Sequence, residues 1–247
     1  MIEKEIRVLP PVPNDPNLIQ AMASDPEVRQ LRERLFSLMG KYKYAYNWTW
    51  YGRPIIQLPQ DVMAMQTLIL EEKPDLIIET GVAHGGSLIM SASMLQILGE
   101  GEVLGIDVDI RAHNRQAIEA HPLAKRISMI QGSSIDTDVA DQVRIRARSA
   151  KRVMVCLDSN HTADHVAREL QLYASLVTPG QHLVVFDTAI ENLPASDFPD
   201  RGWGPGNSPL TAVNAFLKNN PSFVIDRELE ARLLFSVAPE GYLKRVA

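Results

Sequence analysis

The residues of this chain with the most potential for chemistry surround a glycine-rich turn. An apolar run, residues 76–78, ends in the acid Glu79, and a Gly-x-x-x-Gly-Gly turn, residues 81–86, leads into a helical pattern that begins at Ser87. Glycine at a strand-to-helix turn lets the backbone approach a ligand that a Cβ atom would block. The turn lacks the spacing G-x-G-x-x-G that cradles a pyrophosphate. A strand-end carboxylate instead suits a cationic ligand.

A second acid follows the next apolar strand. Residues 102–107 end in Asp107, which lies 28 residues after Glu79. A carboxylate in this position can accept hydrogen bonds from both hydroxyls of a ribose, although it could also do no more than cap the following turn. The Glu79-x-Gly81 turn resembles the start of class I S-adenosylmethionine (SAM) methyltransferases, and a sulfonium beside Glu79 with a ribose at Asp107 would fit SAM as the ligand. The predicted SAM-binding residues are Glu79, Gly81, Ala83, His84, Ser87, Asp107, Ser133, Ser134 and Asp158.

Some of these positions have a structural alternative. Ser133 and Ser134 follow the third strand, where they could contact an adenine edge, cap the next helix, or do both. His84 could line the SAM pocket or begin the helix after the turn. Asp109 is predicted to cap a helix from Ile110 onward.

Two further acids end neighbouring strands. Asp158 follows the apolar run 153–157, and Asp187 follows the run 183–186. Ligands of open α/β sheets bind outside the carboxyl ends of the strands, so both carboxylates should face one cleft. Two adjacent carboxylates repel unless a cation or a proton lies between them. The pair therefore predicts Mg²⁺, which could bind a substrate hydroxyl and lower its pKa, against the alternative of two loop caps.

A histidine near the first of these acids could act as a base. His161 lies three residues after Asp158, and an imidazole can accept a proton near neutral pH. We predict His161 and Asp158 as catalytic residues, although a lone histidine is often structural. His161 and His165 would share a helix face as a zinc pair, but the glutamate of the metalloprotease motif is absent.

Composition excludes some classes of partner. The chain of 247 residues carries a net charge of −5, which argues against a nucleic-acid or an anionic membrane surface. No run of 18 apolar residues occurs. We therefore expect a cytoplasmic protein that binds neither nucleic acid nor membrane.

Strand and helix patterns alternate from residue 61 onward. Strands are predicted at 75–80, 102–107, 126–131, 152–158, 181–187, 222–226 and 232–237, with helices at 61–72, 87–98, 111–120, 136–148, 163–176 and 208–218. This order predicts an α/β fold: a doubly wound, mostly parallel, seven-stranded sheet with helices on both faces and an antiparallel edge. Residues 61–247 would form this domain. Residues 1–60 would form an N-terminal arm with an extended proline-rich stretch, 9–16, and a helix, 26–40.

Aromatic residues suggest where an acceptor could lie. Those at positions 42, 44, 46, 48 and 50 alternate, so an extended segment would place them on one face. Trp50 and Tyr51 could stack on an acceptor, but an oligomer contact or a core seal is favoured because exposed aromatic patches are uncommon. Trp203 lies in a loop, 190–207, that could cover the cleft or be plain surface.

Taken together, these motifs resemble the cephalosporin hydroxylase family. Despite its name, this family has the class I SAM-dependent methyltransferase fold and includes rhamnosyl O-methyltransferases and antibiotic-biosynthesis enzymes. The resemblance runs from about Trp48 to Phe235. Its carriers are Trp50–Gln57 with Pro59 and Asp61, Ile78–Gly81 with Gly85–Ser87, Gly105–Asp107, Leu157–Ser159 with His161, Glu169-Leu170 with Tyr173, Asp187-Thr188 and Gly204–Pro209.

The resemblance implies SAM at the turn and a Mg²⁺ site that includes Asp158 and Asp187. Relatives of the catechol O-methyltransferase type have a basic residue three positions after the first metal acid, and His161 matches it. One departure concerns Phe186, because the family commonly has a glutamate there. Thr188, or the more distant Glu191, would then complete the metal shell, or metal would bind weakly or not at all.

We therefore expect a SAM-dependent O-methyltransferase that acts on a hydroxyl of a small molecule, such as a glycoside or a secondary metabolite, in a homo-oligomer. Two alternatives remain. One is a hydroxylase or other oxidoreductase, for which His161, His165 and Asp158 could hold iron. The other is a non-catalytic SAM-binding protein.

Overall fold

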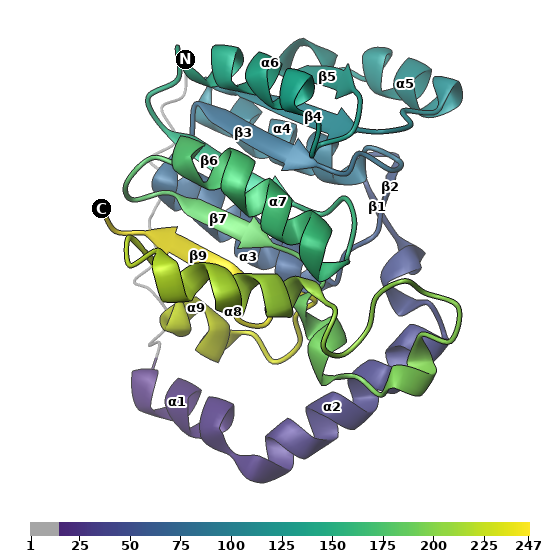
Figure 1. The fold of residues 1–247 in the computed structure, drawn as a ribbon, viewed down its shortest axis with the longest axis vertical. Coiled ribbons are helices and arrows are strands. Elements are labelled where there is room, and N and C mark those ends of the chain that lie inside the picture. The colour runs from purple at the N-terminus through teal and green to yellow at the C-terminus, as the bar shows by residue number, and fades with distance from the viewer. Residues whose placement is uncertain (1–14) are drawn as a thin grey trace, which may run out of the picture.

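A seven-stranded sheet organises the domain (Figure 1). The structure is a computed structural model and describes residues 15–247. The strand order is β5-β4-β3-β6-β7-β9-β8, with β9 antiparallel to both of its neighbours and the first five strands parallel. The strands are β3 (Leu76–Thr80), β4 (Glu102–Asp107), β5 (Ile127–Gln131), β6 (Val153–Leu157), β7 (His182–Val185), β8 (Phe223–Ile225) and β9 (Tyr242–Arg245).

Helices pack on both faces of this sheet (Figure 1). One buried cluster joins the sheet to α3 (Pro59–Glu72), α4 (Gly86–Leu98) and α5 (Ala112–Glu119). The other joins it to α6 (Thr137–Ala147), α7 (Ala163–Tyr173) and α8 (Pro209–Asn219). In β3, Ile77 belongs to the first cluster while Leu76 and Ile78 belong to the second. A central parallel strand is apolar on both faces for this reason, and the predicted fold class is confirmed.

Two helices precede the domain and lie apart from its core. α1 (Pro16–Ser24) and α2 (Pro26–Lys41) form a separate layer at the bottom of Figure 1 and have no buried residues. Asp25 begins α2 by accepting hydrogen bonds from the N–H groups of Glu27 and Val28, which confirms the predicted helix. The sequence patterns missed α1, which begins at the last proline of the stretch 9–16. The rest of that stretch, up to residue 14, lies outside the described residues.

The predicted extended aromatic stripe is wrong. Residues 44–47 form a 3₁₀ turn, η1 (Tyr44–Asn47), and a short hairpin follows, β1 (Trp48–Trp50) and β2 (Arg53–Ile55). Lys43 has a left-handed backbone (φ +52°), which breaks the alternation that a strand would need. The aromatic side chains therefore point in different directions.

The last predicted strand, 232–237, is also wrong. Asp226 caps a short helix, α9 (Arg227–Arg232), by accepting a hydrogen bond from the Leu229 N–H at 2.9 Å. The segment after α9 is fixed by Asp61, whose buried carboxylate accepts hydrogen bonds from the Ser236 hydroxyl and the Val237 N–H. The final strand is β9, which pairs antiparallel with β7. These long-range contacts override the apolar pattern.

The remaining connections include four further 3₁₀ turns, η2 (Ala124–Arg126), η3 (Ala174–Leu176), η4 (Thr188–Asn192) and η5 (Ala195–Asp197). The predicted cap at Asp109 is wrong, because α5 begins two residues later, after Arg111. None of the helices within residues 15–247 is long and apolar enough to cross a membrane.

We predict that Gly81→Ala lowers the free energy of unfolding by roughly 2–5 kcal/mol, because residue 81 combines φ +93° with a Cβ position 2.1 Å from the Asp158 carbonyl oxygen. Gly180→Ala is the control. It has a similar φ of +88° but no atom within 4 Å of its Cβ position, so it should cost about 1–2 kcal/mol. Urea unfolding measures both, and equal losses would show that the close approach is unimportant.

Candidate active site

A cleft of about 540 Å³ opens at the carboxyl ends of β3, β6 and β7. The turn after β3, the segment 158–161 after β6, α2 and η1 all contribute residues to its lining. The strands β4 and β6 flank β3 although they are not consecutive in the chain. The cleft therefore lies at the topological switch point of the sheet, where ligands bind in folds of this class.

The glycine turn is held by the carboxylate of Asp107. One oxygen of Asp107 accepts hydrogen bonds from the N–H groups of Val82 at 2.8 Å and Ala83 at 3.2 Å, and the other accepts from the Asp109 N–H at 3.0 Å. Ala83 has a left-handed backbone (φ +44°), so these bonds stabilise a conformation that alanine seldom adopts. Asp107 thus caps the turn, and the ribose contact expected of it stays a prediction.

A second pair of side chains fixes the same turn from outside. The Arg53 guanidinium donates to the carbonyl of His84 and to the side chain of Asn114, whose amide donates to the carbonyl of Ala83 at 2.8 Å. Arg53 and Asn114 were not predicted as site residues. They are 61 positions apart, and no local pattern signals that they meet. The side chain of His84 lines the cleft.

Glu79 is buried below the turn. The hydroxyl of Ser87 donates a hydrogen bond to its carboxylate, and the residue is 4% exposed. Burial raises the pKa of Glu79 to about 7, although the Ser87 hydrogen bond acts in the opposite direction. A positive charge above Glu79 would stabilise its ionised form. The Glu79 side chain does not line the cleft itself, but borders a small space of about 10 Å³ together with Ser87 and Gln57.

Three side chains converge beside the turn. Within residues 15–247, the group whose donor atoms lie close enough to hold one metal ion is Asp158, His161 and Asp187, with all ligand atoms within 4.8 Å of one another. The His161 Nε2 is 3.5 Å from an oxygen of Asp187. Burial and the negative charges of Asp187 and Glu79 raise the pKa of Asp158 well above its ordinary value. A divalent cation would remove this repulsion, so the donor set fits the predicted Mg²⁺.

Gln57 is a further residue of this site that the sequence patterns did not identify. Its side-chain amide donates to Asp158 at 3.3 Å, and its own carbonyl oxygen is buried without a hydrogen-bond partner among the described residues. An unpaired buried oxygen is costly. It could accept a hydrogen bond from a ligand amine or from a water molecule in the cleft.

Other predicted metal ligands are engaged elsewhere. The hydroxyl of Thr188 is buried and donates to the Pro239 carbonyl at 2.6 Å, so the structure does not bring Thr188 into the group. Glu191 accepts hydrogen bonds from Ser208, Thr211 and the Gly206 N–H. Burial alone would raise the pKa of Glu191, but these hydrogen bonds lower it. Glu191 thus ties the loop 190–207 to the start of α8.

His165 also lies outside the metal group. Its Nε2 contacts the hydroxyls of Ser159 at 3.0 Å and Ser134 at 3.1 Å, and Ser159 donates to the buried Glu169 at 2.7 Å. An iron site from His161, His165 and Asp158 is therefore not formed. The cap of α6 is Asp136, so the capping alternative for Ser133 and Ser134 is wrong. Both serines and Asp107 lie outside the lining of the cleft, and the adenine contact stays a prediction.

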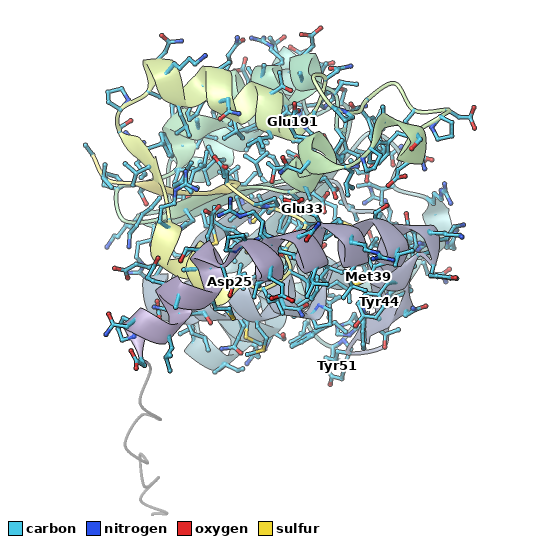
Figure 2. All side chains as sticks on the ribbon, turned by 90° about the horizontal axis from the view of Figure 1, so that it is seen from below. Asp25, Glu33, Met39, Tyr44, Tyr51 and Glu191 are labelled. Atoms are coloured by element: carbon cyan, nitrogen blue, oxygen red, sulfur yellow. The ribbon has the colours of Figure 1, made fainter. Side chains whose placement is uncertain are left out.

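Of the predicted acceptor-binding aromatics, one faces the cleft. Trp203 contacts His161 edge-to-face, with ring centroids 5.1 Å apart. Trp50 donates to Ser93 and packs against the core, and Tyr51 is exposed beside His121; Figure 2 shows Tyr51 at the outer edge. Tyr44 and Tyr46 line the cleft instead. The 3₁₀ turn, which the alternating pattern did not predict, places these two tyrosines at the cleft.

Comparisons with known proteins identify the family. The model of the family "Rhamnosyl O-methyltransferase/CmcI" matches residues 42–246. The chain belongs to this family. A rhamnosyl O-methyltransferase of Mycobacterium tuberculosis (strain ATCC 25618 / H37Rv) is 30% identical over 191 residues, which cover 75% of this chain and 73% of the relative. One of Mycobacterium leprae (strain TN) is 28% identical over 202 residues, covering 80% and 82%.

Solved structures show the same fold. An apo structure of CmcI has a TM-score of 0.58 at 18% identity and covers 82% of this chain and 77% of its own. The O-methyltransferase NovP has a TM-score of 0.55 at 12% identity and covers 94% and 100%. A CmcI structure with Mg and SAM has a TM-score of 0.57 at 18% identity, covering 82% and 78%. The predicted family, fold and class of enzyme, an O-methyltransferase, are therefore confirmed.

We predict that Mg²⁺ raises the thermal unfolding midpoint by about 5–10 °C at saturation and that Asp187→Asn removes this response. Without Mg²⁺ the same variant should unfold at a higher temperature than wild type, because one of two repelling carboxylates is gone. Differential scanning fluorimetry measures both effects. Asp200→Asn, in the loop outside the group, is the control, and an unchanged Mg²⁺ response in Asp187→Asn would exclude this metal site.

Proposed function

We propose that this chain transfers the methyl group of SAM to a hydroxyl of a small-molecule acceptor, with a sugar hydroxyl of a rhamnoside as the first candidate. The observation that carries the proposal is the convergence of Asp158, His161 and Asp187 on the cleft that also holds the glycine turn. The names of the curated relatives support the rhamnosyl acceptor.

The cofactor would lie along the glycine turn. Gly81, Ala83 and Ser87 would contact it, Asp107 would accept hydrogen bonds from its ribose, and the Glu79 carboxylate would face its positive end. SAM supplies an electrophilic methyl group when bound. Because Asp107 and Arg53 fix the turn before any ligand arrives, little conformational entropy would be lost on binding.

Mg²⁺ would be held by the two carboxylates. Asp158 and Asp187 offer the oxygen ligands that this ion prefers, so His161 need not be a ligand. Mg²⁺ supplies Lewis acidity when bound, which lowers the pKa of an acceptor hydroxyl. The His161 imidazole would accept the acceptor's proton, and the nearby Asp187 carboxylate would stabilise the imidazolium that results.

Trp203 would complete the acceptor side of the cleft. Its ring contacts both His161 and Phe198, and Arg201 lies over its face at 5.3 Å. The loop 190–207 is also attached to α2, because Ser37 donates to Asp197 at 2.8 Å. This arrangement would exclude water and hold the acceptor oxygen in line with the methyl group, which is the main source of rate in such a displacement.

We expect the purified protein to methylate methyl α-L-rhamnopyranoside from SAM in the presence of Mg²⁺. His161→Ala should lower kcat by about 10²–10⁴, because a general base is lost, while the Kd for SAM stays unchanged. Release of S-adenosylhomocysteine measures the rate, and calorimetry measures SAM binding. His113→Ala, an exposed histidine on α5, is the control. No SAM binding by wild type would refute the proposed function, and full activity of His161→Ala would refute the base.

The arm would also provide a contact between copies of this chain. α2 and the residue that ends it expose a stripe of apolar side chains at spacings of four, three and four: Leu31, Leu35, Leu38 and Tyr42, which are 59%, 45%, 45% and 72% exposed. This spacing is that of a helix-pairing seam, which is complementary to itself. We therefore infer a homo-oligomer in which α2 packs against α2 of a second copy.

Leu35→Glu should reduce the molar mass in solution to that of the 27.5 kDa monomer, because a charge would be buried in the seam. Met63→Glu, at an exposed apolar position of α3, should leave the assembly intact. Light scattering after gel filtration measures both variants. A wild-type protein that is already monomeric at micromolar concentration would refute the contact.

A further inference from the structure

A second cavity adjoins the candidate active site and has no part in the site described above. It has a volume of about 520 Å³ and lies between the arm, α1 and α2, and the segment around α9. Phe36, Ala189 and Leu193 line both this cavity and the cleft. The two spaces are therefore neighbours that share one wall, and a single ligand could extend from one into the other.

The cleft and the second cavity lie one after the other along α2. Met39 and Gly40 line the cleft, Phe36 lines both spaces, and Arg32 and Arg29 line the second cavity. From Phe36 to Arg29 the helix rises about 10 Å. Figure 2 shows α2 crossing this side of the domain from Asp25 to Met39, with Glu33 between them. A ligand that lies under α2 would meet these side chains in that order.

The walls of the second cavity differ in chemistry. Its domain side has an apolar stretch, Ala231, Leu233 and Leu234, next to polar and charged residues of the same segment. Its arm side carries Arg29, Arg32 and Glu33, for which no ion pair occurs within residues 15–247. These three side chains leave one net positive charge at the far end.

Two acids on the α9 side of the cavity share one cation. Arg227 forms ion pairs with Glu230 at 3.0 Å and with Glu240 at 3.5 Å. One net negative charge therefore remains on this side, while the arm side carries one net positive charge. The guanidinium groups on α2 are the strongest hydrogen-bond donors that the cavity offers, and they match a carboxylate or a similar oxygen-rich anion.

We propose that this second cavity binds the part of the acceptor remote from the reacting hydroxyl, and that the acceptor is an extended glycoside with an apolar segment next to the sugar and an anionic group at its end. This rests on the proposed function, which places the sugar at Asp158 and Asp187. A SAM molecule and a sugar together fill a pocket of ordinary size. The rest of a longer acceptor passes Phe36 and lies beneath α2.

The test compares two probes, methyl α-L-rhamnopyranoside and 8-carboxyoctyl α-L-rhamnopyranoside. With wild type, the long probe should bind at least 10-fold more tightly and show a correspondingly lower KM, while kcat stays the same because the reacting end is identical. Calorimetry in the presence of S-adenosylhomocysteine measures binding without turnover.

Ala23→Trp fills the cavity from α1, and Ala21→Trp is its control. Ala23 is half-buried and lines the second cavity, whereas Ala21 is exposed on the same helix and does not. Ala23→Trp should abolish the advantage of the long probe and leave the short probe within 2-fold, and Ala21→Trp should behave as wild type. Arg32→Ala should weaken the long probe several-fold, and Arg34→Ala, exposed on α2, should not.

The outcomes separate this proposal from the proposed function. Equal binding of the two probes by wild type overturns the second cavity as a subsite, whether or not either probe is methylated. A preference for the long probe that persists in Ala23→Trp also overturns it, because the tail then binds elsewhere. If wild type binds SAM but neither probe, the rhamnoside acceptor is overturned, and with it the proposed binding of a longer acceptor in the second cavity. If wild type does not bind SAM either, the methyltransferase assignment is overturned.

Discussion

The close approach of β3 and β6 at their carboxyl ends is the constraint on which the site depends. A Cβ atom at Gly81 would lie 2.1 Å from the carbonyl oxygen of Asp158, and the Asp158 N–H donates to the Thr80 carbonyl at 2.9 Å. A glycine at this position therefore brings the turn after β3 and the Asp158 carboxylate together on adjacent strands. In the proposed function, the methyl donor and the acceptor would meet where these two segments touch.

Negative charge is the second property of this site. Glu79, Asp158 and Asp187 lie close enough for their charges to raise the pKa of Asp158, and burial raises the pKa of Glu79. Cations bound at the carboxyl ends of these strands would lower this cost. A sulfonium near Glu79 and a divalent ion between the aspartates would each offset part of the repulsion. The absence of a carboxylate at Phe186 is consistent with this balance, since Phe186 packs in the core beside Cys156.

The arm helix α2 contributes to the lining of the cleft without belonging to the buried core. Neither α1 nor α2 has a buried residue, and α2 is attached to the loop 190–207 through Ser37 and Asp197. Substitutions of exposed side chains in such an element change the free energy of unfolding of the protein little. The glycine turn on the domain side, in contrast, is held by the side chains of Arg53, Asn114 and Asp107.

The sequence by itself determined the fold class and the residues at the strand ends. Parallel strands carry their carboxyl ends to one edge, so Asp158 and Asp187 could be placed in one cleft from the local pattern. Contacts between distant segments were decided by the tertiary structure. Arg53 meets Asn114, Thr188 turns its hydroxyl to Pro239, and Asp61 fixes the segment that looked like a last strand. Periodicity records which face of an element is apolar, but not which distant polar group completes a hydrogen bond, and that pairing is fixed when the chain packs.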